Sequence, residues 1–132
     1  MSAELLIPAM LNDASITALI GDRLALNRLP PNSTFPACVY QIISDTPNPF
    51  IDYLNGQQLT KARVQFNPLA ASVGAVIQIQ AAIKALMNFK HSTTYSGILL
   101  MSSRVEMLGN FEQDVETGVW TRPIDYFIQY YQ

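Results

Sequence analysis

The chain has 132 residues, of which 49% are hydrophobic, 14% are charged and one is cysteine, and its formal net charge is −2. This length suits one domain with a buried core, so we expect residues 1–132 to form a single domain. The small net charge gives no reason to expect a nucleic-acid or membrane partner, one cysteine excludes an intramolecular disulfide, and no apolar run approaches the roughly 18 residues of a membrane span.

The first twenty residues predict two short helices. Ser2 can cap the first helix, with Glu4 in its first turn, where a carboxylate suits the helix dipole. Pro8 lacks the N–H that an interior position needs, so this helix must kink or begin near it. Asp13 is the expected cap of the second helix, which spans ASITALI and is closed by a glycine. The start has no basic region of a signal peptide, and we expect synthesis and assembly in the cytosol.

Strands and an arm are predicted next. Residues 23–29 are a strand candidate, and residues 37–44, ACVYQIIS, are rich in the β-branched and aromatic side chains of strands. Residues 45–58 contain two prolines, two asparagines and a glycine, which indicates a long loop or arm. Three bulky residues on this arm are candidate contacts to a neighbouring subunit: Phe50, Ile51 and Tyr53.

The second half of the chain predicts one more strand, a long helix and two final strands. Residues 58–67 largely alternate between apolar and polar side chains, and the proline that follows is expected to end that strand. Residues 72–89 repeat apolar side chains at helical spacing. Residues 97–108 and 119–131 are the last strands. This order is typical of an α+β fold, a mostly antiparallel sheet packed against one long helix.

The last strand, within RPIDYFIQYYQ, carries bulky side chains on both faces. Ile124, Tyr126, Ile128 and Tyr130 share one parity, whereas Phe127 and Tyr131 share the other. An exposed sheet face is normally polar, so the second face also needs a cover. Two covers are conceivable: a neighbouring subunit, or helices of the same chain on both faces. The low charge content, against about 25% in typical domains, favours coverage of much of the surface by other subunits.

Negative charge is concentrated near the C-terminus. Residues 105–132 carry five acids and one arginine, whereas residues 1–104 carry seven basic and five acidic residues. The segment 109–118 is the expected tip between the last two strands, where Glu112, Asp114 and Glu116 share one parity and can point the same way. These carboxylates can keep a tip solvated, form a negative collar along a DNA channel, or dock on a basic patch of a partner.

Candidate chemistry is sparse. Cys38 and His91 are the only cysteine and histidine, so a thiol enzyme built on this dyad is the one enzymatic alternative. Cys38 lies within a predicted strand, where cysteine usually behaves as a small buried hydrophobe, and His91 follows the long helix. The sequence contains no cysteine–histidine cluster for a metal and no glycine spacing of a nucleotide site. We therefore expect a protein that is not an enzyme and that has no cofactor or metal.

The whole-chain pattern resembles the tail terminator, or tail-to-head joining, proteins of long-tailed bacteriophages. The segment ITALIGDRLALNRLPPNSTFPACVYQIIS is similar to their opening helix, Gly-Asp-Arg step and Val-Tyr strand. ARVQFNPLAASVGAVIQIQAAIKALM resembles their strand, turn and single long helix, and RPIDYFIQYY their terminal strand. The matching positions in the first segment are Leu19, Gly21, Asp22, Arg23, Pro30, Pro36, Val39 and Tyr40. Pro8 in the first helix departs from the pattern.

This resemblance implies a structural role. Proteins of this family are built like tail-tube subunits and form a hexameric ring that caps the tube, ends its polymerisation and joins the tail to the head connector. The expected partners are further copies of the chain, the tail-tube protein and the head-completion or connector protein, with DNA passing through the ring without specific binding. The expected location is the tail or neck of the virion, after assembly in the host cytoplasm. The alternative within this class is another connector or minor tail protein.

Overall fold

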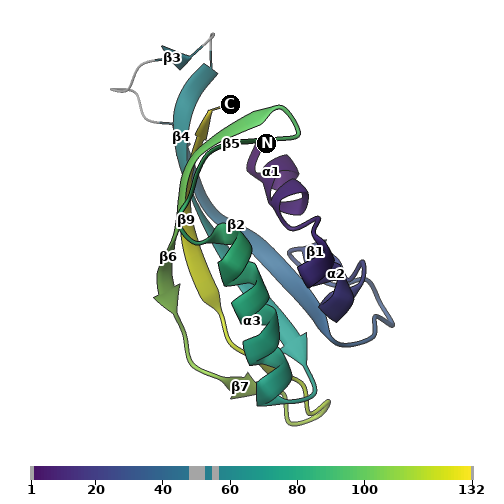
Figure 1. Cartoon of the computed structure of the whole chain (residues 1–132). Coiled ribbons are helices and arrows are strands. Elements are labelled where there is room, and N and C mark those ends of the chain that lie inside the picture. The colour runs from purple at the N-terminus through teal and green to yellow at the C-terminus, as the bar shows by residue number, and fades with distance from the viewer. Residues whose placement is uncertain (1, 48–52, 55–56, 132) are drawn as a thin grey trace.

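A curved, mostly antiparallel sheet carries all three helices on one face (Figure 1). The computed structural model describes residues 2–47, 53–54 and 57–131. The elements in these ranges are α1 (Ser2–Met10), α2 (Ala14–Ile20), β1 (Leu24–Leu26), β2 (Ala37–Pro47), β3 (Tyr53–Leu54), β4 (Gln57–Ala70), α3 (Val73–Met87), β5 (Lys90–Tyr95), β6 (Ile98–Leu108), β7 (Glu112–Gln113), β8 (Trp120–Thr121) and β9 (Ile124–Tyr131).

The main strands are hydrogen-bonded in the order β1-β2-β4-β9-β6-β5. Only β1 runs parallel to its neighbour, β2; the other described pairs are antiparallel. The short β3 pairs with the start of β4, and the small β7–β8 hairpin joins the end of β4. The predicted α+β class, a mostly antiparallel sheet against one long helix, is confirmed.

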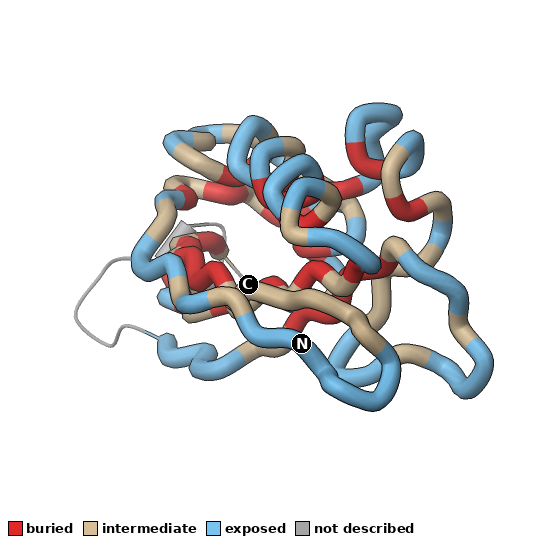
Figure 2. The backbone as a smooth tube through the Cα atoms, turned by 90° about the horizontal axis from the view of Figure 1, so that it is seen from below, coloured by how far each residue is buried: buried red, intermediate tan, exposed pale blue. Residues whose placement is uncertain are grey.

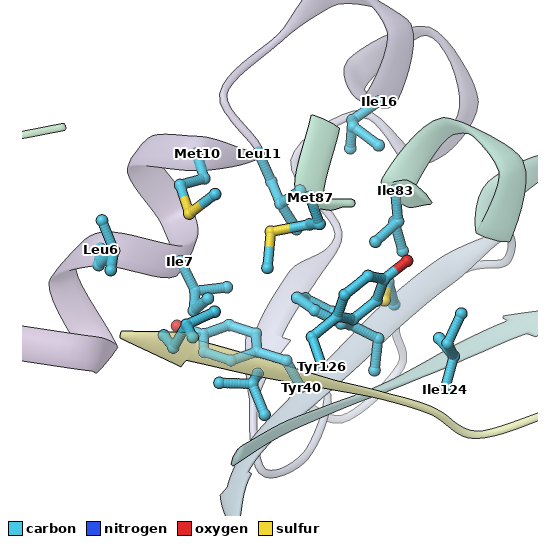
Figure 3. Packing of buried hydrophobic residues seen from close by; sticks show 14 of the residues in the cluster. Leu6, Ile7, Met10, Leu11, Ile16, Tyr40, Ile83, Met87, Ile124 and Tyr126 are labelled. Carbon is cyan, nitrogen blue, oxygen red and sulfur yellow. The ribbon is translucent and has the colours of Figure 1, made fainter. Parts of the chain in front are cut away.

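The core lies between the helices and one face of the sheet. In β4 from Thr60 onward, and throughout β9, the even-numbered residues are buried, and the register places Val64 opposite Tyr126 and Phe66 opposite Ile124. The rings of Phe66 and Tyr126 meet edge to face, with centroids 5.7 Å apart, an arrangement that aromatic pairs prefer. Figure 3 shows side chains from α1 and α3, among them Ile7 and Met87, packed over the sheet. Buried segments of both layers face each other in Figure 2.

The helices form where local signals and apolar spacing agree. Asp13 caps α2 by accepting hydrogen bonds from the N–H and the hydroxyl of Ser15, and these two bonds lower the pKa of its carboxyl. Ser72 caps α3 by accepting from the N–H of Ala75. One stripe of α3 is buried, as its spacing predicts: Val76, Ile79, Gln80, Ile83 and Met87. No single helix among the described residues is long and apolar enough to cross a membrane; α1 and α2 reach that length only as a pair bent by 89°.

Two prolines lie inside elements that they were expected to end or bend. Helix α1 contains Pro8 and continues two residues beyond it, to Met10, so the missing N–H affects only its last turn. Strand β4 contains Pro68, although a strand end was predicted there. On one side Pro68 lies opposite Cys38, and on the other side the pairing is interrupted between Phe66 and Leu69. Pro68 therefore occupies a position at which no ladder hydrogen bond is lost.

The predicted strand boundaries differ from the observed ones in several places. The candidate strand 23–29 shortens to β1, and β2 continues to Pro47, into the segment predicted as an arm. Strand β5 was missed, because its sequence KHSTTY has no apolar face. The predicted last strand is two strands, β8 and β9, separated at residues 122–123.

Both outer edges of the sheet are only partly paired. Pairing of β5 to β6 ends at Ser103, and the N–H of Val105 instead donates to Oδ1 of Asn88, 3.0 Å away. At the other edge β1 covers only three residues of β2, and the rest of β2 contains a bulge at Ile43 and ends at Pro47. Bulges, prolines and capped N–H groups interrupt the regular row of donors and acceptors that an incoming strand needs.

The face of the sheet opposite the helices is not covered by any described helix (Figure 1). More than half of its residues from Leu59 to Leu69 of β4 and in β9 are polar: Lys61, Arg63, Gln65, Asn67, Asp125 and Gln129, against Leu59, Leu69, Phe127 and Tyr131. The hypothesis that helices of the same chain cover both faces is therefore wrong. The even-numbered residues of β9 face the core, and its odd-numbered residues lie on this uncovered, mostly polar face.

Candidate functional site

The structure separates Cys38 from His91. Cys38 lies in β2 and His91 in β5, and three strands lie between them in the sheet. At about 4.8 Å per strand the two strands are roughly 19 Å apart, too far for a dyad. His91 is exposed and lies in a strand, not at the helix end where it was predicted.

The environment of Cys38 also opposes nucleophilic chemistry. Its side chain is fully buried, and burial raises the pKa of the thiol to about 12. Since the thiolate is the nucleophile, a cysteine with a raised pKa is inert near neutral pH. Among the described residues no group of three or more His, Cys, Asp or Glu side chains could hold a metal ion.

The uncovered sheet face carries a hydrogen-bonded charged network. Nε of Arg63 donates to Oδ2 of Asp125 at 2.9 Å, and Nε2 of Gln65 donates to Oδ1 of the same carboxylate at 3.0 Å. Asn67 extends the network by donating to Oε1 of Gln65. Asp125 is only 1% exposed, so these donors replace the water that its charge would otherwise bind.

Phe127 lies beside this network, between two cations. Nζ of Lys61 lies 4.2 Å from the centre of the Phe127 ring, and the guanidinium carbon of Arg104 lies 5.4 Å from it. Both distances suit cation–π attraction, which lets an aromatic ring sit on a polar surface. Arg104 also pairs with Glu106 at 3.2 Å. Most charges on this face are thus paired with one another. The face is suited to contact with another protein surface, and its groups are not arranged for catalysis.

The acidic tip is present, but its carboxylates do not share one strand face. Glu112 lies in β7, whereas Asp114 begins a turn closed by a hydrogen bond from the N–H of Gly118 to the carbonyl of Asp114. The carboxylate of Asp114 accepts from the N–H of Glu116, at 2.9 Å. All three acids are exposed. The parity argument fails because residues 114–118 are a turn, yet the negative charge does gather at one tip.

The predicted arm is described only in part. Tyr53 lies in β3, opposite Gln58 of β4. Phe50 and Ile51 lie outside the described residues. Their assignment as contacts to a neighbouring subunit therefore stays a prediction.

Sequence reasoning missed the pairing of Arg63 with Asp125. The available signal was an acid near the start of a strand that is otherwise mostly apolar and aromatic, because such an acid needs a buried partner. The partner is 62 residues away in the chain, and the register of β4 against β9 brings the two together.

Comparison with known proteins gives a fold likeness. No protein-family model matches the chain, and no curated protein matches it. Among solved structures, a protein chain in the virion of a native gene transfer agent particle is similar, with a TM-score of 0.67 and 11% sequence identity. The match covers 98% of this chain and 97% of that chain. The two chains therefore share a fold from end to end.

Proposed function

We propose that this chain is a structural protein of a phage virion, which forms a ring that caps the tail tube. The ring ends polymerisation of the tube and joins the tail to the head connector. One observation carries the proposal: the fold is shared over nearly the whole chain with a chain of a gene transfer agent virion. The resemblance of the sequence to tail terminators narrows this to the cap, with six copies as the ring size.

The composition of the molecular surface supports the proposal that the chain works within an assembly. Only 14% of the residues are charged, and several large apolar side chains are at least two fifths exposed, among them Ile43, Ile77, Met107 and Leu108. Such surface is costly in a free protein and becomes favourable when partners cover it. The expected partners are other copies, the tail-tube protein and the head connector.

The proposed mechanism is geometric. One surface of the ring matches the last ring of the tube, whereas the opposite surface must not accept another tube subunit, because a stack of identical head-to-tail contacts otherwise grows without limit. DNA passes through the ring without sequence-specific contacts. No bond is made or broken by the protein in this mechanism.

Electron microscopy of particles made with and without this chain tests the proposal. Without it, we expect heads that fill with DNA and tails that are abnormally long or not joined to heads. Supplying the chain in trans should restore joined tails of uniform length. Normal tails joined to heads in its absence would overturn the proposal, whereas tails of normal length that fail only to join would favour a different connector or minor tail protein.

A further inference from the structure

An apolar groove of about 380 Å³ lies between α3 and the last part of β6. Its lining includes Ile77 and Ala81 of α3, Met107 and Leu108 of β6, and Ile124 of β9. Ile77, Met107 and Leu108 are each about half exposed, at 46%, 51% and 49%. Isolated exposed apolar side chains are common, but three that line one hollow form a patch of the kind that marks a binding surface.

Two cations border this groove without a carboxylate to neutralise them. Lys84 lies on the same face of α3 as Ile77, seven residues later, and Arg122 precedes β9. The ion pairs within residues 2–47, 53–54 and 57–131 are Arg63 with Asp125 and Arg104 with Glu106, so neither cation has one. Glu106 also lines the groove, but Arg104 already compensates its charge. The groove therefore combines an apolar floor with a net positive rim.

Arg122 is held in a fixed position. Its Nε donates to Oε1 of Gln80 at 2.7 Å, and its guanidinium stacks on the ring of Phe111 at 4.2 Å. The amide of Gln80 in turn donates to the carbonyl of Arg122 at 2.6 Å. A cation that is already ordered loses little side-chain entropy when it binds a carboxylate.

The outer face of α3 gives independent support for a cover. Lys84 is the only charged residue in this helix of 15 residues. The other exposed positions are small, apolar or uncharged: Gly74, Ile77, Gln78, Ala81 and Ala85. A helix that borders solvent normally carries several charges on its outer face. This face is suited to close contact with another protein surface.

The acidic tip has the complementary chemistry. Val115 is 93% exposed and lies between Asp114 and Glu116, with Glu112 nearby in β7. The turn is held by the hydrogen bond from Gly118 to Asp114 and by the contact of the Asp114 carboxylate with the N–H of Glu116. The tip therefore presents one apolar side chain on a shaped turn, surrounded by negative charge.

We infer that the tip of one copy docks in the groove of the neighbouring copy. Val115 enters the apolar floor, and Glu112 and Glu116 approach Lys84 and Arg122 of the neighbour. The contact joins two different surfaces of identical chains, and such contacts give a ring when the rotation between neighbours closes. This inference rests on the ring of the proposed function and names the residues that hold neighbours together.

The position of the two surfaces agrees with a ring. The β7–β8 hairpin pairs with the end of β4, α3 begins directly after β4, and Leu108 lies opposite Ile124. The tip and the residues that line the groove thus lie on elements toward the same end of the sheet. If the ring axis runs along the strands, rotation about it keeps these two surfaces at the same height, so they can meet between neighbouring copies.

Cysteine cross-linking of the full-length purified chain tests the contact. In the double variant Val115→Cys/Ala81→Cys, oxidation should give a ladder of disulfide-linked oligomers on non-reducing electrophoresis. Each single variant should give dimers at most, and wild-type Cys38 is too buried to react. The matched control is Val115→Cys/Ala18→Cys, which places the second thiol on an exposed alanine of α2. No more intermolecular product from the 115/81 pair than from this control, or only an intramolecular bond, would overturn the inference.

A charge exchange tests the specificity of the same contact. In the 115/81 background at low salt, Lys84→Glu should reduce the yield of oligomers about tenfold, and adding Glu116→Lys should restore most of it. Asp22→Lys, which changes an exposed acid elsewhere, should not restore it. Restoration by both lysines, or by neither, would contradict the pairing of these residues.

The results separate this contact from the proposed function. If cross-linking failed, but particles that lack the chain still had unjoined tails, only this interface would be disproved and the proposed function would stand. If cross-linking was efficient, but particles made without the chain were normal, only the proposed role as a tail cap would be disproved. If Glu116→Lys left cross-linking unchanged but abolished joining to heads, the tip would dock on another virion protein or line the DNA channel, and the proposed contact would be wrong.

Discussion

Asp125 places a negative charge inside a sheet face that no described helix covers. The charge is tolerated because Arg63 and Gln65 donate hydrogen bonds to both carboxylate oxygens. Removal of one member of such a pair leaves the other charge desolvated, which costs more than the pair itself contributes. The stability of this face thus depends on the pair as a unit.

We predict that Arg63→Met lowers the free energy of unfolding by about 3 kcal/mol, because it leaves the Asp125 carboxylate unpaired. The double variant Arg63→Met/Asp125→Asn should recover part of this loss. Arg104→Met is the matched control: the side chains of Arg104 and Glu106 are 57% and 35% exposed, so the loss should stay below about 1 kcal/mol. Urea denaturation measures all three, and equal losses for Arg63→Met and Arg104→Met would contradict the special role of the buried pair.

For Cys38 we predict very slow reaction with an aromatic disulfide reagent. Burial raises its pKa from 9.0 to about 12, so at pH 8 the folded thiol should react roughly a thousandfold more slowly than the thiol of the urea-unfolded chain. Because the unfolded chain releases this proton first, Cys38 makes the fold less stable as pH rises from about 9 toward 12, and Cys38→Ala should reduce that slope. His91→Ala should change neither rate nor assembly. Fast reaction of Cys38 in the folded state would contradict this prediction and favour a functional role for the thiol.

At the scale of elements, the end of β6 depends on a glycine. The N–H of Gly109 donates to the carbonyl of Pro123 at 2.8 Å, which fixes the tip segment to the start of β9. A Cβ at position 109 would lie 2.6 Å from Cγ of Pro123 and 3.3 Å from its carbonyl oxygen. Pro123 directly precedes β9, so its backbone is held by the sheet and cannot move away freely.

We therefore expect Gly109→Ala to lower the free energy of unfolding by about 1–3 kcal/mol, as overpacking does. Gly74→Ala is the matched control, because its new Cβ meets nothing within 4 Å and lies in α3, where alanine favours the helix by about 0.5 kcal/mol. Thermal unfolding of both variants gives the comparison. If Gly109→Ala were as stable as Gly74→Ala, the close approach to Pro123 would not constrain the tip.

The elements that could be predicted are those whose signals are local. Helix α3 has a serine cap and a stripe of apolar residues at helical spacing, so its bounds follow from the sequence within about two residues. Strand β5 carries no such signal, because its side chains are mostly polar and show no apolar face. Pro68 misled the prediction because its tolerance depends on where pairing to β9 stops, which is a property of the whole sheet.

For the molecule as a whole, contacts between distant segments limited what the sequence could reveal. The acidic tip was predictable from the clustering of Glu112, Asp114 and Glu116, although their parity was wrong because the turn was not foreseen. The groove was not predictable, since it exists only where α3 packs over the end of β6. The order of elements was enough to predict the α+β class. The candidate contact surfaces could be identified only once the pairing register of the strands was known.

The interrupted edges of the sheet have a consequence for the time before assembly. In the proposed function each tail needs one ring, so a cell that makes this protein in excess would hold unused copies at high concentration. The Asn88 contact to Val105, the bulge at Ile43 and Pro47 at the end of β2 interrupt stretches of edge from which amyloid-like fibres could otherwise start. In the proposed function, such unused chains would remain a reserve for tails that are completed later.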